Sequence, residues 1–222
     1  MRFRRREDES TGDPADDPAD NPADNGADEQ APGDVRAAGP YDLADLADLA
    51  DAGPDYDRID LGGLLVVPFE GSELQLQVDE QSGTVLAALM VGPTGAVELA
   101  AFAAARSGDL WTDVRREIAA DVTQRGGTAT EQQGPFGPEL ACLVPVVLPD
   151  GQQLTQPSRV VGVEGPRWLL RATLLGEPAV EPEQAAVFED AIRSVVVRRG
   201  NEAMAPGEPL PLKLPPDAQR VG

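Results

Sequence analysis

The sequence predicts an α+β fold in which two principal helices pack on a mainly antiparallel sheet. From residue 59 onward, short apolar runs alternate with turn residues, which is typical of strands joined by hairpins. Two longer segments, at about 109–122 and 181–194, instead carry apolar side chains at intervals of three and four. We therefore expect a single α+β domain over residues 58–200.

The first strands are predicted from alternation. Residues 72–78 alternate polar and apolar side chains without a break, and the turn at 81–83 leads into the apolar run 84–91. This pair predicts a hairpin. A second turn at 92–95 precedes the alanine-rich residues 96–105. Their composition is compatible with helix or strand, and the neighbouring hairpins favour a strand.

The two helices are predicted from periodic apolar faces. Asp109 is a plausible N-cap for the first, and Gly126 and Gly127 end it. Its apolar face is formed by Trp111, Val114, Ile118 and Val122. The second helix, about 181–194, leads into a strand at 195–198. Apolar runs at 140–148, 158–163 and 167–175 predict an antiparallel meander between the two helices.

Both ends of the chain differ from this domain in composition. Residues 1–57 carry 17 acidic and 5 basic side chains, a net charge of −12, and include four tandem copies of one tetrapeptide at 13–28. We expect a disordered acidic arm there, because it has too few large apolar side chains to offset the entropy cost of ordering. Within it, the repeat at 42–50 spaces leucines for one or two helical turns. Prolines in residues 201–222 predict an irregular tail.

The composition excludes much of the enzyme repertoire. The chain has no histidine, and Lys213 is its only lysine. Histidine is the usual general base, and lysine is needed for Schiff-base chemistry. We therefore predict no catalytic residues, no cofactor site and no metal site. Asp109, Asp113 and Glu117 share one helix flank and could hold a cation, but helix capping explains the first two more simply.

Partners and location are predicted from charge and hydropathy. The chain of 222 residues has a net charge of −21, which disfavours nucleic-acid binding because phosphate contacts need clustered cations. The sequence shows neither a membrane span nor a secretory signal, so we expect a cytoplasmic protein. The single cysteine, Cys142, lies in an apolar run and predicts a buried thiol rather than a reactive one. An unidentified protein partner remains open.

Several strings in this sequence resemble an actinobacterial family known as domain of unknown function 3710. They are GPYD at 39–42, RIDLGGL at 58–64, RSGDLW at 106–111, GPFGPEL at 134–140 and QPSRVVGVEGPRWLLR at 156–171. The resemblance covers about residues 39–215 and implies an actinobacterial, intracellular protein without an assigned activity. The order of elements is also similar to the Mog1/PsbP-like arrangement, an antiparallel sheet with helices on its faces.

Three arginines are the candidate ligand-binding residues. Arg167 and Arg171 are expected on one face of a strand and Arg159 on its neighbour, where guanidinium groups could bind a carboxylate or phosphate. Ion pairing with Glu139, Glu164 or Glu117 is the simpler interpretation. The leading functional hypothesis is a non-catalytic binding module. The alternatives are a sensor or enzyme for a phosphorylated or nucleotide-like anion acting through these arginines, and a structural accessory.

Overall fold

The computed structural model describes residues 39–49, 58–79, 81–148 and 151–215. The chain divides into two units, residues 1–33 and 34–222, and all described residues belong to the second. The disorder expected for residues 1–57 falls mostly outside the described residues, as does the end of the tail expected from residue 201. The description that follows concerns the second unit only.

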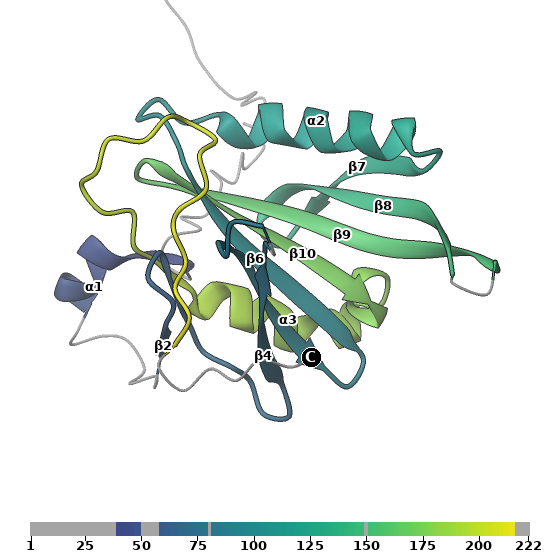
Figure 1. The fold of residues 1–222 in the computed structure, drawn as a ribbon, viewed down its shortest axis with the longest axis horizontal. Coiled ribbons are helices and arrows are strands. Elements are labelled where there is room, and N and C mark those ends of the chain that lie inside the picture. The colour runs from purple at the N-terminus through teal and green to yellow at the C-terminus, as the bar shows by residue number, and fades with distance from the viewer. Residues whose placement is uncertain (1–38, 50–57, 80, 149–150, 216–222) are drawn as a thin grey trace, which may run out of the picture. The chain divides into compact units, whose positions relative to one another are not determined.

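The centre of this unit is an antiparallel sheet of seven strands (Figure 1). In chain order the strands are β4 (Glu73–Val78), β5 (Val85–Gly92), β6 (Gly95–Ala103), β7 (Thr128–Gly134), β8 (Gly137–Val147), β9 (Gln153–Gly165) and β10 (Trp168–Gly176). Their order across the sheet is β4-β5-β6-β10-β9-β8-β7. Five of the six junctions join consecutive strands by hairpins. The sixth pairs β6 with β10, which α2 and strands β7, β8 and β9 separate along the chain.

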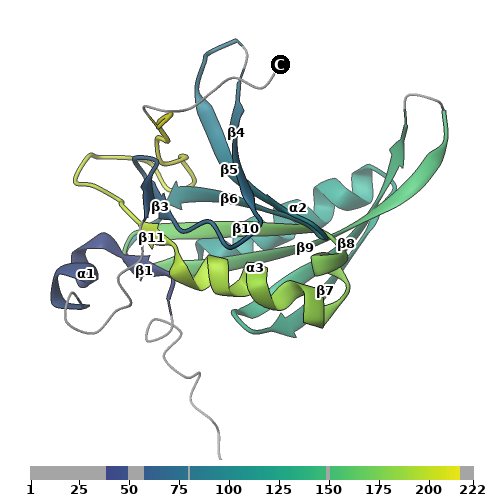
Figure 2. The ribbon, with the colours of Figure 1, turned by 90° about the horizontal axis from the view of Figure 1, so that it is seen from below.

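Two helices cover opposite faces of this sheet (Figure 2). Helix α2 (Leu110–Gln124) lies over β7, β8 and β9, and α3 (Pro182–Ser194), which follows the short helix η2 (Glu177–Ala179), packs on the other side. Each helix contributes to a separate cluster of buried apolar side chains on its own face of the sheet. Trp111 and Val122 of α2 are buried with Leu140 and Leu169, whereas Phe188 and Ile192 of α3 belong to the larger cluster. The predicted fold class is confirmed.

A smaller sheet of four short strands adjoins the large one. Its order is β1 (Tyr41–Asp42), β11 (Val196–Val197), β3 (Leu64–Val66) and β2 (Ile59–Asp60). Strand β1 leads directly into α1 (Leu43–Leu49), so the predicted helical turns in the leucine repeat are confirmed for the residues described. The β1–β11 pair is parallel and joins residues about 155 positions apart, Tyr41 with Val196.

The start of α2 is capped by a residue from another strand. Asp109 occupies the N-cap position as predicted, but its backbone is left-handed and its side chain makes no capping hydrogen bond. Instead, the Glu164 carboxylate of β9 accepts from the backbone N–H groups of Asp109 and Trp111, both at 3.2 Å. An anionic group at a helix N-terminus is stabilising. Glu164 is thereby used by the helix and is not an ion-pair partner of the candidate arginines.

The packed chain extends beyond the limits of 58–200 at both ends. Residues 41–42 form β1 before that range, and Leu210 and Leu212 after it are buried, at 2% and 8% exposure. The backbone N–H of Leu210 donates to Ala101 O, and that of Lys213 donates to Leu61 O, both at 2.8 Å. The prolines prevent a long strand after Gly200, but Pro209 and Leu212 still form isolated β-bridges with the large sheet and with the residues between β2 and β3. The segment is therefore packed against the domain and is not a free tail.

Strand β7 was not predicted from the sequence. Its residues, TATEQQG, are mostly polar and exposed, and they do not alternate. An edge strand that is solvated along most of its length has no apolar period to reveal it. Its pairing with β8, from Thr128 opposite Leu143 to Gly134 opposite Gly137, defines it instead.

Candidate functional site: an arginine-lined pocket

The three candidate arginines do not meet. Arg159 of β9 faces α3, where it contacts Glu189. Arg171 of β10 faces the other side of the sheet, where its guanidinium lies 5.2 Å from the ring centre of Phe102. Arg167 lies at the β9–β10 turn, with a positive φ of 64°. The strand predicted for 167–175 begins one residue later, at Trp168. The three side chains therefore cannot share one ligand.

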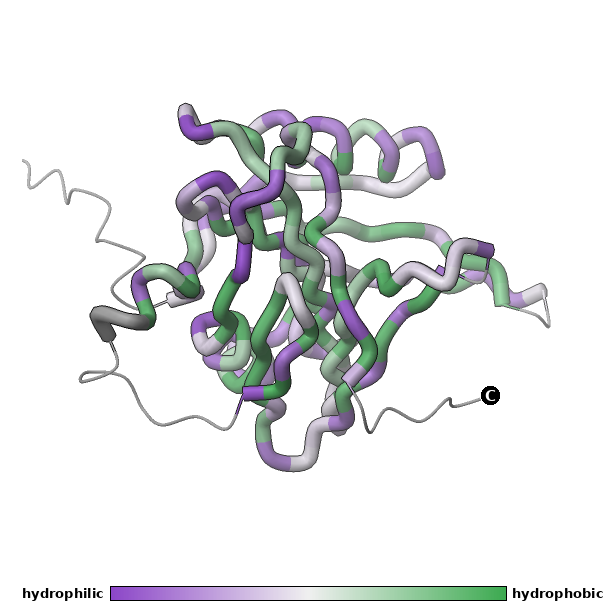
Figure 3. Tube along the Cα trace, turned by 60° about the vertical axis from the view of Figure 1, so that its left-hand side comes forward, coloured by the Kyte–Doolittle hydropathy of each residue, from purple (hydrophilic) through white to green (hydrophobic). Residues whose placement is uncertain are grey.

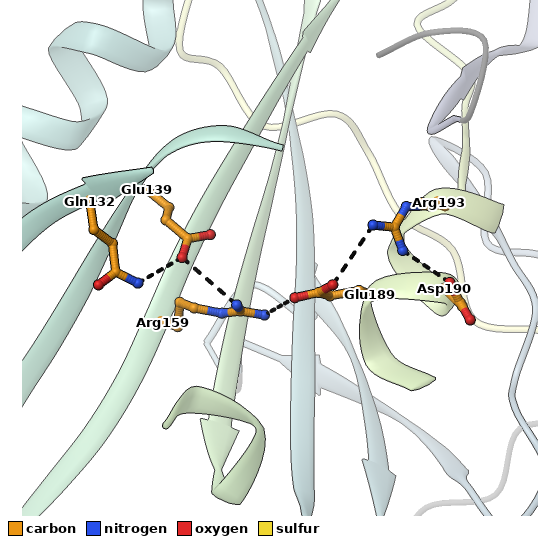
Figure 4. Close-up of polar contacts among 6 residues, drawn as sticks. All are labelled: Gln132, Glu139, Arg159, Glu189, Asp190 and Arg193. Atoms are coloured by element: carbon orange, nitrogen blue, oxygen red, sulfur yellow. Dashed lines mark hydrogen bonds and ion pairs between the residues drawn. The ribbon is translucent and has the colours of Figure 1, made fainter. Parts of the chain in front are cut away.

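Arg159 belongs to a buried chain of charged groups (Figure 4). One guanidinium nitrogen lies 2.5 Å from Glu189 Oε1, and the other lies 3.8 Å from Glu139 Oε1. Glu139 is only 1% exposed, and its Oε1 also accepts a hydrogen bond of 2.9 Å from Gln132. Glu139 is one of the three carboxylates named as possible partners of the candidate arginines, and Arg159 is the arginine that it contacts. A buried arginine between two carboxylates has its charge compensated within the protein.

The chain continues along α3 toward solvent. Arg193 lies 3.7 Å from Glu189 and 2.9 Å from Asp190, and its guanidinium stands over the ring of Phe136 at 4.9 Å. At the other end, Glu139 packs against Gly134 so closely that a Cβ at Gly134 would collide with its carboxylate. A side chain at position 134 would therefore require the Glu139 carboxylate to move. These contacts fix the outer sheet to α3 and leave no opening for a ligand at Arg159.

Arg171 is also neutralised within the protein. Its guanidinium lies 3.4 Å from Glu98 Oε1 of β6, the strand beside it, and Gln77 of β4 donates to the other oxygen of Glu98 at 3.1 Å. The pairing differs from the one predicted, because Glu139, Glu164 and Glu117 are not its partners. Glu98 lies on the adjacent strand on the same face, a relation that only the strand order reveals.

A pocket of about 430 Å³ lies where the small sheet meets the β9–β10 turn, and it contains Arg167. Its walls come from three segments that are distant in sequence: the β1–α1 junction, the β9–β10 turn and the residues after β11. The principal lining side chains are Asp42, Leu43, Pro166, Arg167, Arg198 and Arg199. Three arginines and one carboxylate give this pocket a positive lining in a strongly acidic chain.

Arg167 and Arg199 are held in the pocket by backbone carbonyls. Arg167 donates to Gly200 O at 3.1 Å, and Arg199 donates to Arg167 O at 3.1 Å and to Glu202 O at 3.2 Å. These bonds direct Arg167 toward the residues after β11 and direct Arg199 toward the β9–β10 turn. A guanidinium has five N–H donors, so most remain available after these contacts. Among the described residues, no carboxylate pairs with Arg167 or Arg199.

Other arginines of the chain, including Arg198 in the same pocket, differ from Arg167 and Arg199 in having carboxylate partners. Seven others form ion pairs with carboxylates within the described residues, namely Arg115, Arg116, Arg125, Arg159, Arg171, Arg193 and Arg198. Carboxylates are abundant in this chain, which has 39 acidic residues. Two adjacent guanidinium groups without a carboxylate repel one another, and an anion between them would relieve that repulsion.

The remaining polar side chains support the pocket wall. Arg198 forms a bidentate pair with Asp60, at 2.8 and 3.0 Å, and this hydrogen bonding lowers the pKa of Asp60 below its usual value. Asp42 accepts from the Trp168 indole N–H at 2.7 Å and from Ala44 N at 2.8 Å, so both its oxygens are engaged. Trp168 itself is buried.

Sequence reasoning identified one of the three pocket arginines. Arg198 and Arg199 were missed, because they follow a short strand and precede Gly200 without any recognisable motif. The only available signal was the adjacent pair of arginines itself. Neither the parallel β1–β11 pairing nor the approach of the β9–β10 turn to Gly200 can be derived from local sequence.

Comparison with known proteins places the chain in a family. The family model described as "Protein of unknown function (DUF3710)" matches residues 39–221. The chain belongs to this family. The match to DUF3710 includes all three pocket arginines and agrees with the resemblance found in the sequence. No curated protein matches the chain.

Among solved structures, this DUF3710 chain is similar to cyanobacterial PsbP (CyanoP) from Synechocystis sp. PCC 6803. The likeness covers 66% of this chain and 95% of that one, at 12% sequence identity and a TM-score of 0.38. A superposition this partial says nothing about activity. None of the helices described is long and apolar enough to span a membrane.

Proposed function

We propose that this chain is a non-catalytic binding module whose ligand presents an anionic group to Arg167 and Arg199. One observation carries the proposal. Two neighbouring arginines line a pocket and donate only to backbone carbonyls among the described residues, although the chain is rich in carboxylates. Backbone acceptors orient a guanidinium without neutralising it, so the site retains a positive charge for a ligand.

The binding role is favoured over catalysis by the side chains available. The chain has no histidine, and its single lysine, Lys213, does not line the pocket. Asp42, the carboxylate of the pocket, already accepts two hydrogen bonds, so it is poorly placed to remove a proton from a ligand. The pocket can therefore recognise an anion, but it has little with which to transform one.

The alternative based on Arg159, Arg167 and Arg171 acting together loses its geometric support. Arg159 and Arg171 lie on opposite faces of the sheet and each contacts a carboxylate. Only Arg167 keeps donors toward a pocket, and there its partners are Arg198 and Arg199. A phosphorylated or nucleotide-like anion stays within the proposal as one class of ligand for this pocket.

We also infer that the protein acts in the cytoplasm of an actinobacterium. Its preference for arginine over lysine and its content of 23 glycines and 21 prolines fit a GC-rich genome. Its single cysteine excludes an intramolecular disulfide, which is compatible with a reducing compartment. Fluorescence microscopy of a tagged full-length chain in an actinobacterial host checks this location, and a signal at the cell surface would contradict it.

Calorimetric titration of the full chain tests the proposed function. The probes are pyrophosphate and a hexaglutamate peptide, which present phosphate and carboxylate groups separately. We expect saturable binding of at least one probe at low salt. Arg199→Ala should weaken it about 10-fold or more, because a hydrogen bond to a charged group contributes ~1.5–3 kcal/mol. Arg167→Asn should act similarly, and asparagine tolerates the left-handed backbone at this position.

Arg116→Ala is the matched control. Arg116 is an exposed arginine on α2 that pairs with Asp113 and does not line the pocket. Its replacement removes the same charge from the chain. In a parallel titration at about 0.15 M salt, where exposed charges more than ~8 Å apart are largely screened, it should leave binding within about 2-fold. The proposal fails if neither probe binds, or if the control weakens binding as much as Arg199→Ala does.

A further inference from the structure

The pocket beside the small sheet contains a negative charge as well as positive ones. Asp42 lines it together with Arg167, Arg198 and Arg199. Arg198 is neutralised by its bidentate pair with Asp60, which leaves two guanidinium groups and one carboxylate in the lining. Among the described residues, Asp42 forms no ion pair with an arginine of the pocket. Opposite charges therefore line one pocket without neutralising each other.

The Asp42 carboxylate is oriented by two neutral donors. Its Oδ1 accepts from the backbone N–H of Ala44, the second residue of α1, at 2.8 Å. Its Oδ2 accepts from the indole N–H of Trp168 at 2.7 Å. An ionised carboxylate has about four lone-pair sites, so acceptor positions remain for a further donor. Asp42 is thus fixed in orientation, keeps its negative charge and can accept from a ligand without removing its proton.

The two unpaired guanidinium groups of the pocket follow the same pattern. Arg167 donates to Gly200 O, and Arg199 donates to Arg167 O and to Glu202 O. Uncharged partners therefore hold charges of both signs at the pocket wall. An internal ion pair would neutralise such charges, as the Arg198–Asp60 pair does at the edge of the same pocket. A ligand that carries both signs of charge would complement all three groups.

Another part of the pocket wall is apolar. Leu43 and Ala44 contribute to it from the start of α1, and Pro166 contributes from the β9–β10 turn. Figure 3 shows hydrophobic and hydrophilic colouring following one another along α1, whose sequence is LADLADL. The volume of about 430 Å³ lies within the range of about 300–1,000 Å³ that small-molecule sites occupy. The pocket therefore suits a small molecule that has an apolar group as well as charges.

We propose that the ligand of this pocket is a small zwitterion of the amino-acid type. Its carboxylate binds Arg167 and Arg199, and its ammonium group binds Asp42. Its aliphatic part contacts Leu43 and Pro166. This inference rests on the proposed function, because the same two arginines bind the anionic group. It adds a requirement for a positive group, which a phosphate or a simple carboxylate does not meet.

The charge of the whole chain also favours a zwitterion over a polyanion. The net charge of −21 repels anionic ligands as they approach, whereas a zwitterion carries no net charge. Within the pocket, each end of the zwitterion forms charge-assisted hydrogen bonds, and a guanidinium can bind a carboxylate through two of them. A hydrogen bond to a charged group is strong enough to change an affinity about 10-fold. The ammonium group should therefore contribute measurably to binding.

Calorimetric titration of the full chain with matched ligands near neutral pH tests the inference. L-leucine is compared with isocaproate, which has the same skeleton without the ammonium group, and with leucinamide, which lacks the carboxylate. A second pair, ε-aminocaproate and caproate, repeats the first comparison with a longer spacing between the charges. We expect at least one zwitterion to bind saturably below about 10 mM and about 10-fold more tightly than its monocarboxylate. Leucinamide should bind more weakly than L-leucine.

Asp42→Asn tests the group assigned to the ammonium. The substitution removes the charge, while asparagine keeps one acceptor oxygen and is itself a favourable residue before a helix. Each zwitterion should then bind within about 2-fold of its monocarboxylate, because the uncharged amide attracts an ammonium only weakly. Asp45→Asn is the matched control, since Asp45 is exposed on α1 and does not line the pocket. It should retain the full preference for the zwitterion.

The outcomes separate this inference from the proposed function. If pyrophosphate, hexaglutamate or a monocarboxylate binds through Arg199 and neither zwitterion binds more tightly than its analogue, the proposed function stands and this inference is overturned. If no ligand of any series binds, both are overturned. A preference that survives Asp42→Asn, or that Asp45→Asn abolishes equally, also overturns the inference, because a general attraction of ammonium groups to an acidic chain would then explain it.

Circular dichroism checks that Asp42→Asn keeps its sheet signal. If that variant does not fold, Arg199→Ala and the parent chain decide the outcome. Arg199→Ala should weaken the binding of L-leucine about 10-fold and leave the binding of leucinamide within about 2-fold, since leucinamide has no carboxylate for the arginine. Equal binding of L-leucine and leucinamide by the parent chain, or equal losses for both in Arg199→Ala, overturns the inference.

Discussion

Two regions of the protein differ in the partners of their arginine side chains. Between the outer sheet and α3, Arg159 is buried and flanked by Glu139 and Glu189. In the pocket beside the small sheet, Arg167 and Arg199 are more exposed and contact backbone carbonyls. The carboxylates neutralise Arg159 and connect β9 with β8 and α3. The backbone carbonyls orient Arg167 and Arg199 without neutralising their charges, which stay available to a ligand. Arginine content alone could not have distinguished a structural cation from a binding one.

The largest effect is expected from breaking the buried region. Arg159→Ala leaves Glu139 and Glu189 without their shared cation in a buried environment. Removing one partner of a buried ion pair costs about 3–5 kcal/mol. We expect the free energy of unfolding, measured by urea titration, to fall by that amount. A loss below ~1 kcal/mol would show that the buried region does not depend on charge compensation.

A companion variant sharpens the same point. Replacing Glu139, Arg159 and Glu189 together with Leu, Met and Leu removes every charge of the buried group at once. Because apolar replacements of a buried ion-pair network are often neutral or stabilising, the triple variant should be more stable than Arg159→Ala alone. If the triple variant is the less stable of the two, packing rather than charge explains the loss in the single variant.

Gly134→Ala should have the next largest effect. The added methyl would collide with the Glu139 carboxylate, which is buried and would have to leave Gln132 and Arg159 in order to move. Overpacking of this kind typically costs about 1–3 kcal/mol. Urea titration measures the loss of unfolding free energy. Gly134→Ala combined with Glu139→Ala relieves the clash, so the double variant should lose less than the sum of the single effects.

Asp60 tests an exposed pair at the edge of the pocket. Hydrogen bonding from Arg198 lowers the pKa of Asp60, so the folded state binds its proton less readily than the unfolded state does. The resulting stabilisation is present above the ordinary aspartate pKa of about 3.9 and is lost as pH falls through the lower folded value. Asp60→Asn should cost about 0.5–1 kcal/mol at pH 7, a range discounted for exposure.

The difference between Asp60→Asn and the parent chain should shrink below about pH 4, where the parent aspartate takes up its proton. Thermal unfolding followed across pH 3 to 7 measures this convergence. A difference that stays constant with pH would mean that the pair stabilises the β2 region through geometry rather than charge.

A comparably small effect is expected in the pocket itself. Arg199→Ala removes two hydrogen bonds to backbone carbonyls but no ion pair among the described residues, so the free energy of unfolding should fall by only about 1 kcal/mol. This result would complete the contrast with Arg159→Ala. A loss of 2 kcal/mol or more in urea titration would instead make Arg199 a structural arginine, and the pocket would lose its functional interpretation.

How much of this could be predicted from the sequence depends on the range of the interactions involved. Alternation at 72–78 predicted β4, and the apolar face of Trp111, Val114, Ile118 and Val122 predicted α2, because local periods follow from backbone geometry. Glu139 was named as a possible partner of the candidate arginines, but the sequence did not indicate that Arg159 is the one it contacts. The solvated edge strand β7 and the packing of Leu210 were missed, because neither has a local apolar period.

The sequence by itself determined every strand of the large sheet except β7, the two long helices, the burial of Trp111 and a chemistry without imidazole. Those properties follow from side-chain period and composition, which are readable residue by residue. Only the tertiary structure decided which arginines are neutralised. Arg167 and Arg199 are 32 positions apart, and the β9–β10 turn brings them together beside β1. Charge pairing depends on distances of a few ångströms, and strand order and layer packing set those distances.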